Sequence, residues 1–134
     1  MERYTLGKNE RLKSRKSIER VFKEGKSFSN FPFRVVYIME ASEATSSLQA
    51  GFSVSTRYFK KAVDRNRVKR LMREGYRLQK NSLLATLKKQ QLSLVIFIIY
   101  TGNLLPEYSD VFEKTGSIIK RLIKFAGENI EANS

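Results

Sequence analysis

The chain has 134 residues, 41% of them hydrophobic and 29% charged, which suits one domain with a buried core. Its 26 lysines and arginines exceed its 13 acidic residues, and the net charge is +13. This excess predicts a polyanionic partner, nucleic acid first and an anionic membrane surface second. The absence of cysteine excludes disulfides and thiolate chemistry and fits a cytoplasmic protein. No apolar run approaches the ~20 residues of a membrane span, and no signal peptide is evident.

The positive surplus lies in two segments. Residues 3–26 hold nine basic and three acidic residues, and residues 57–77 hold nine basic and two acidic residues. The remaining positions hold eight of each sign and are neutral together. A protein that was basic only for solubility would not need this segregation, so we expect localised basic surfaces.

The first part of the chain predicts an arm, a helix and two strands. Residues 1–13 lack apolar periodicity and are expected to form a flexible basic arm. A short helix is predicted over Arg15–Glu24, where apolar residues recur at helical spacing. Strands are predicted over Phe33–Met39 and Leu48–Ser55, with a polar loop at 41–47 between them. Their order favours an antiparallel hairpin.

The second part predicts a long helix, a buried strand and a final helix. The long helix covers about Tyr58–Gln79, with a second short piece reaching Lys89. The segment 92–100, LSLVIFIIY, is apolar on both faces, as a central strand should be. The final helix runs from a Ser109 cap to about Ala126, and residues 127–134 are expected to fray. Its predicted buried stripe comprises Val111, Phe112, Thr115, Ile119, Leu122 and Ala126. The order α-β-β-α-β-α predicts one sheet packed with helices, an α+β domain.

The two faces of the predicted strands differ in composition. Phe33, Val35, Tyr37 and Met39 alternate with Arg34, Val36 and Ile38 in the first strand. In the second strand, Ala50, Phe52 and Val54 alternate with Gly51, Ser53 and Ser55. The aromatic faces are expected to form the core. The opposite face is either covered by a helix or open enough to admit a nucleic-acid backbone or base.

The segment 60–77, KKAVDRNRVKRLMREGYR, predicts a two-sided helix. At about 100° per residue, its apolar residues gather on one side and its basic residues on the other, with Asn66 at the centre of the basic side. The i,i+4 neighbours Arg65, Lys69 and Arg73 are like-charged, and each such pair destabilises a helix by roughly 0.2–0.5 kcal/mol. An anionic partner relieves this repulsion, and guanidinium groups can hold phosphate bidentately. We therefore predict nucleic-acid binding, with a merely solvated face as the alternative.

The sequence predicts no autonomous active site. It lacks histidine, the commonest general base and metal ligand, and it has no glycine-rich phosphate loop or nucleophile elbow. Its carboxylates are scattered, and Glu107, Asp110 and Glu113 are better explained by the dipole of the final helix. Any chemistry is therefore expected to belong to a partner.

Two stretches resemble the protein subunit of bacterial ribonuclease P. The first is residues 51–77, GFSVSTRYFKKAVDRNRVKRLMREGYR, which has the family's Arg-Asn-Arg core followed by Lys-Arg and Arg-Glu. The second is residues 11–28, RLKSRKSIERVFKEGKSF, which is similar to the family's first helix. The match is good over about residues 9–77, and the final strand and helix match in order more than in residues.

The resemblance implies a ribosomal protein S5 domain 2-like α/β sandwich with a left-handed βαβ crossover, against the usual right-handed rule. It also implies that an RNA subunit cleaves the 5′ leader from precursor tRNA with bound metal ions, while the protein assists. The expected partners are the ribonuclease P RNA and precursor tRNA with its single-stranded leader, without DNA or membrane. Mg²⁺ is expected on the RNA subunit, with no metal or catalytic residue on the protein.

Two groups of candidate site residues follow from the basic helix and the resemblance. The residues expected to bind RNA are Arg57, Lys60, Lys61, Arg65, Asn66, Arg67, Lys69, Arg70 and Arg73. The residues expected to line a leader-binding cleft between the first helix and the sheet are Arg11, Ile18, Phe22, Arg34, Val36, Ser53 and Ser55. Ile18 stands where many members have an aromatic residue, Val36 where some have tyrosine, and Thr56 where a lysine is common. Without the resemblance, Phe22 is explained better as part of a buried stripe with Ile18.

Other classes of protein stay open on the residues alone. A ribosomal or other structural RNA-binding protein has the same composition. A DNA-binding module is a further alternative, although no helix-turn-helix pattern is present.

Overall fold

The computed structural model describes residues 10–12, 14–42 and 46–133, with side chains through residue 128. The elements are α1 (Arg15–Glu24), β1 (Lys26–Asn30), β2 (Phe33–Ala41), β3 (Leu48–Val54), α2 (Ala62–Gln90), β4 (Leu92–Tyr100) and α3 (Tyr108–Asn133). This order has one strand more than we predicted. The additional strand β1, KSFSN, has a single large apolar residue and is mostly exposed, so its own sequence carries little strand signal. It becomes a strand by pairing with β2.

The four strands form one mixed sheet in the order β1-β2-β4-β3. β4 is central, antiparallel to β2 and parallel to β3. The predicted hairpin is therefore wrong, because β2 and β3 each pair with β4 and not with each other. β4 carries large apolar residues on both faces and gains most from a place between two strands. β3, α2 and β4 together form a parallel βαβ unit, as the resemblance implied.

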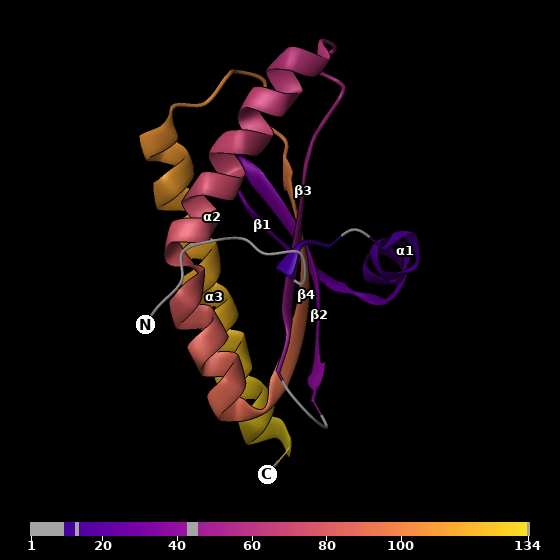
Figure 1. Ribbon diagram of the computed structural model, residues 1–134, viewed down its shortest axis with the longest axis vertical. Coiled ribbons are helices and arrows are strands. Elements are labelled where there is room, and N and C mark those ends of the chain that lie inside the picture. Colours follow the sequence, from indigo (N-terminus) through magenta and orange to yellow (C-terminus); the bar gives the residue numbers. More distant parts are fainter. Residues whose placement is uncertain (1–9, 13, 43–45, 134) are drawn as a thin grey trace.

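The helices divide between the two faces of the sheet. α1 lies on one face, and α2 and α3 pack together on the other (Figure 1). The predicted α+β class, one sheet packed with helices, is confirmed. The predicted bounds of α1 are also correct: the Ser14 side chain accepts a hydrogen bond from the Ser17 N–H at 3.4 Å and caps the helix start.

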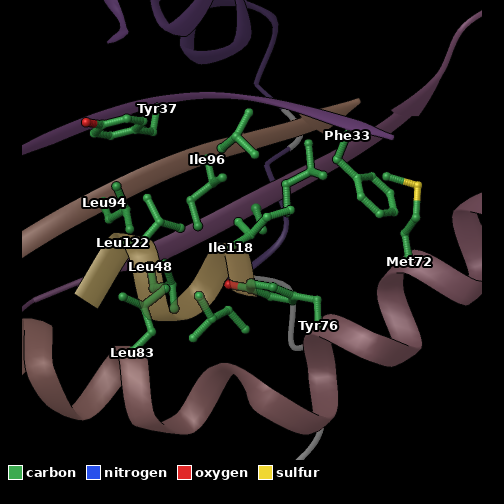
Figure 2. Packing of buried hydrophobic residues seen from close by; sticks show 14 of the residues in the cluster. Phe33, Tyr37, Leu48, Met72, Tyr76, Leu83, Leu94, Ile96, Ile118 and Leu122 are labelled. Carbon is green, nitrogen blue, oxygen red and sulfur yellow. The ribbon is translucent and has the colours of Figure 1, made fainter. Parts of the chain in front are cut away.

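The main core fills the space between the sheet and the α2–α3 pair. Phe33 and Val35 of β2 and Leu94 and Ile96 of β4 project from the sheet into it, as strand alternation predicts. Figure 2 shows the opposing side chains of α2 and α3, which are Met72, Tyr76, Leu83, Ile118 and Leu122. Each of these is at most 1% exposed. Burying one such side chain contributes roughly 1.5–3 kcal/mol.

Both long helices differ from their predicted bounds. α2 begins at Ala62 and not at Tyr58, because residues 58–61 form a loop whose carbonyl groups at Phe59 and Lys60 are bound by Arg65. α2 is one continuous helix of 29 residues, which ends at Gln91 in the left-handed region with φ 56°. α3 continues through Asn133, past the predicted end at Ala126. Its buried stripe is as predicted except for Phe112, which is 37% exposed beside Tyr108, whereas Ile118 is fully buried. None of the helices in the described ranges is long and apolar enough to cross a membrane.

Candidate nucleic-acid interface

The first half of α2 and the loop before it carry the predicted basic surface. Arg57, Lys60 and Lys61 are exposed in the loop, and Asn66, Arg67, Arg70 and Arg73 are exposed on the helix. Arg65 and Lys69 are partly buried. Because Val68 and Met72 are buried against the core, the helix is held with its cationic side outward. We call this set of nine residues, with Arg65 and Lys69 included, the basic face.

Arg65 has a structural task that the sequence did not predict. Its Nη1 donates hydrogen bonds to the carbonyl oxygens of Phe59 and Lys60, at 2.8 and 2.7 Å. These two bonds fold the loop back onto the first turn of α2. Arg65 therefore fixes the position of the neighbouring lysines in addition to carrying charge itself.

The loop before α2 is fixed at its other end too. The Ser55 Oγ accepts a hydrogen bond from the Arg57 N–H at 3.3 Å, and the Ser55 N–H donates to the Tyr100 carbonyl at 3.1 Å. The Arg57 guanidinium lies 5.4 Å from the centre of the exposed Tyr58 ring. This places a cation and an aromatic face together on the surface, a combination that suits nucleic-acid backbones and bases.

The cations of the basic face are not neutralised within the described part of the chain. None of its nine side chains forms an ion pair there, and Glu74, which follows Arg73 on the helix, pairs with Arg77 instead. This contact lowers the pKa of Glu74, so the carboxylate stays charged and stays with Arg77. The basic face therefore presents uncompensated positive charge.

A hollow of about 390 Å³ adjoins the basic face at the edge of β3. Arg11, Ile18, Phe97 and Arg73 line it, together with neighbouring residues of β3. The structure thus brings two predicted leader-cleft residues, Arg11 and Ile18, together with Arg73 of the basic face. The two predicted surfaces are continuous at this point.

Phe97 is the site residue that our sequence interpretation missed. It lies at the centre of the sheet face beneath α1, and its ring meets Phe22 edge-on with centroids 5.0 Å apart. Gly51 is its neighbour in β3, where a Cβ atom would come within 2.8 Å of the Phe97 ring. The sequence of 92–100 predicts equal burial of both strand faces. In the structure the two faces differ, since Val95, Phe97 and Ile99 are only partly buried.

The other predicted cleft residues occupy different environments. Ser53 and Arg34 lie in one row across the sheet, on either side of Ile99, and both retain exposure. Phe22 is 49% exposed, so it is not the buried stripe residue of the alternative interpretation. Val36, in contrast, is only 4% exposed and lies beneath α1 near Gly25, so it offers no surface to a ligand. The predicted arm is described only at 10–12, and residues 1–9 and 13 lie outside the described ranges.

These features define a class, a small basic α+β protein with a cationic helix face and an adjoining hollow lined by an aromatic ring. Among the residues that the structure describes, no group of three or more acidic side chains could hold a metal ion. The class thus has the charge needed to bind a polyanion.

The chain belongs to the ribonuclease P family, whose family model, Ribonuclease P, matches residues 6–123. It is 39% identical over 124 residues to the ribonuclease P protein component of Porphyromonas gingivalis, covering 92% of this chain and 88% of that one. It is 31% identical over 116 residues to the component of Clostridium novyi, covering 87% and 96%. These matches confirm the family that the resemblance indicated.

Solved structures agree with this assignment. The RNase P protein from Thermotoga maritima matches with a TM-score of 0.63 and 31% identity, covering 84% of this chain and 96% of that one. The Staphylococcus aureus RNase P protein shares the fold, with a TM-score of 0.66 at 24% identity and coverage of 84% and 94%.

Proposed function

We propose that this chain is the protein component of ribonuclease P, the ribonucleoprotein that removes the 5′ leader from precursor tRNA. The observation that carries the proposal is the coincidence of the family match, which spans nearly the whole chain, with an unneutralised basic face. In this assignment the RNA subunit performs the cleavage, and the protein is the accessory subunit of an endoribonuclease acting in the cytoplasm.

The basic face is the proposed contact with the RNA subunit. Its exposed arginines, Arg67, Arg70 and Arg73, have guanidinium groups that match phosphate geometry. Asn66 lies among them and can donate and accept hydrogen bonds to a ribose. Binding there removes the like-charge repulsion along α2 and releases counterions from the RNA.

The hollow beside β3 is the proposed entrance for the single-stranded leader. Arg11 and Arg73 supply positive charge for the backbone, while Phe22 and Phe97 supply aromatic surface for a base. Ile18 contributes an apolar contact in place of a stacking ring. Ser53, Arg34 and Ser55 extend the polar floor away from α1, and Val36 is not part of it.

The protein's own contribution is electrostatic. The Mg²⁺ ions that hydrolysis requires would be held by the RNA subunit, and no side chain of this chain is assigned to the reacting atoms. Positive charge on the basic face and around the hollow lowers the repulsion between two RNAs, and thereby favours substrate binding and raises metal affinity in the complex.

The test of the basic face is a salt titration of binding to the ribonuclease P RNA. We expect Arg70→Ala to weaken binding and to flatten the log–log salt slope by roughly 0.7–0.9, the signature of one lost phosphate contact. Lys89→Ala is the matched control, because Lys89 is an exposed cation in the last turn of the same helix. An unchanged slope for Arg70→Ala, or an equal change for Lys89→Ala, would count against the proposed contact.

A second measurement separates this function from that of a structural ribosomal protein. The purified protein should stimulate cleavage of precursor tRNA by the RNA subunit at low magnesium concentration. If it gives no stimulation but co-sediments with ribosomes in high salt, the structural RNA-binding alternative is correct.

A further inference from the structure

A buried lysine of α2 pairs with the segment that lines the proposed leader hollow. Lys80 of α2 is only 1% exposed, and its ammonium group pairs with the carboxylate of Glu10, in the segment that precedes α1. Burial lowers the pKa of Lys80, which shows that its surroundings disfavour the charge. A buried ion pair of this kind rarely stabilises a fold more than apolar residues of the same volume would. The pair therefore calls for an explanation other than stability.

The pair lies at the point where the N-terminal segment meets the sheet. Arg11 forms an isolated parallel bridge with Ala50 of β3, and the Leu12 N–H donates to the Ala50 carbonyl at 2.9 Å. Leu12 is 7% exposed and lies against Gly51. A single bridge is a weak attachment compared with a full strand. Within residues 10–12, the ion pair between Glu10 and Lys80 joins the segment to α2.

The anchored segment supplies one wall of the hollow. Arg11 follows Glu10 directly and lines the hollow, as Arg73 of α2 also does. Two arginines brought together from the segment and from α2 repel each other in the absence of an anion. A restraint on Arg11 opposes that repulsion before the leader arrives, and the Glu10 carboxylate paired with Lys80 is one residue away.

We propose that Lys80 is a positioning residue for leader recognition. It acts through Glu10 to hold the 10–12 segment against β3, so that Arg11 stands over the hollow before RNA binds. Preorganisation of this kind reduces the ordering cost when the leader enters. This inference rests on the proposed function, since it assigns Lys80 a part in leader binding at the same hollow.

The test begins with a measurement that is independent of RNA. Lys80→Met replaces the buried ammonium group with an apolar side chain, and the Glu10 side chain, which is 32% exposed, can turn to water, so we expect the variant to fold. It should release the segment, and hydrogen exchange of the Leu12 amide measured by NMR should become faster. Lys89→Met, on an exposed part of α2, should leave that exchange unchanged. Wild-type exchange at Leu12 in Lys80→Met would overturn the proposal.

The second measurement uses the holoenzyme assembled with the RNA subunit. Affinity is compared for precursor tRNA with a long leader and for mature tRNA. We expect Lys80→Met and Arg11→Ala each to reduce the preference for the long leader by roughly three- to tenfold, as loss of one charged contact does. The double variant should lose no more than either single variant, because both act on the same contact. Binding to mature tRNA should not change.

The remaining outcomes are also decisive. If Arg11→Ala loses the leader preference and Lys80→Met keeps it, Lys80 has no positioning role, although the leader hollow stands. If neither variant alters the preference, the hollow is not the leader site, and both proposals fail together. If Lys80→Met weakens binding to leader-bearing and mature tRNA equally and lowers the unfolding temperature, the role of Lys80 is purely structural.

Glu10→Ala provides an independent variant from the exposed side of the pair and should reproduce the loss of leader preference.

Discussion

Several single residues of the candidate interface have both a structural and an electrostatic role. Arg65 belongs to the basic face but also binds the carbonyl groups of the preceding loop. Arg73 belongs to the basic face and to the hollow. Glu74, which could have neutralised the basic face, is instead held by Arg77. Because the Glu74 carboxylate pairs with Arg77, which lies outside the basic face, the positive charge of the basic face is not neutralised by it.

Phe22 provides a test of the hollow at the same scale. Replacement by alanine removes an exposed ring that meets Phe97 edge-on. If a leader base stacks there, Phe22→Ala should weaken binding of leader-bearing substrate by roughly 1–3 kcal/mol and leave mature tRNA unaffected. Equilibrium binding with both substrates measures the difference. Phe31→Ala is the control, because Phe31 is 77% exposed in the β1–β2 turn; an equal effect of both variants would contradict stacking in the hollow.

Among the elements, α1 is positioned by the way it ends. Gly25 follows α1, and its N–H donates to the Val21 carbonyl at 2.9 Å. A Cβ atom at this position would lie 2.8 Å from the Tyr37 carbonyl oxygen and would also clash with the Val21 carbonyl. The backbone of Gly25 has an ordinary negative φ, so glycine is required here by close approach and not by backbone conformation.

Substitution of this glycine should therefore destabilise the protein. We expect Gly25→Ala to lower the free energy of unfolding by about 1–3 kcal/mol, because the clashing atoms are backbone and cannot rotate away. Gly127→Ala is a matched control in α3, where a Cβ atom meets no atom within 4 Å. It should raise stability by roughly 0.5–1 kcal/mol through helix propensity. Urea unfolding of both variants measures the two changes, and a neutral Gly25→Ala would contradict the close approach.

The whole molecule is organised around β4. This strand is paired on both sides, and helices cover both of its faces (Figure 1). The parallel pairing of β3 with β4 brings the end of β3, and the loop after it, to the start of α2. The basic face and the hollow are both positioned by this arrangement. The position of the basic face therefore depends on the buried strand β4.

This arrangement predicts where local unfolding should be hardest. Amides of β4 should exchange with solvent only through global unfolding, whereas those of β1, an edge strand, should open at lower free energy. Hydrogen–deuterium exchange resolved by mass spectrometry can compare peptides from the two strands. Equal protection of β1 and β4 would show that the sheet opens as one unit.

The elements that were predicted correctly carry their information locally. α1 has a capping serine and apolar residues at helical spacing, and β4 has a continuous apolar run. The basic face was also predictable, because like charges at i,i+4 appear directly in the sequence. β1 was not predicted, since it has no apolar alternation of its own and depends on β2.

The candidate cleft was only partly predictable. Arg11, Ile18 and Phe22 were predicted through the family's motif; Arg11 and Ile18 line the hollow, and Phe22 contacts Phe97. Val36 was included, but α1 covers it. Phe97 was missed because burial of a strand face depends on which helix covers it and how closely. The pairing of Lys80 with Glu10 could not be found from the sequence either, since it joins residues 70 positions apart.

The sequence by itself determined the charge of this protein, the absence of histidine and cysteine, and the amphipathic pattern of its helices. These properties follow from residue identity and local spacing, and they predicted a nucleic-acid-binding protein without an active site of its own, whereas RNA as the partner came from the family resemblance. The tertiary structure alone decided the strand order, the burial of Val36 and the hollow that Arg11 and Arg73 both line. Those features depend on contacts between segments that are far apart in the sequence. Tertiary packing decides such contacts, and local propensity does not.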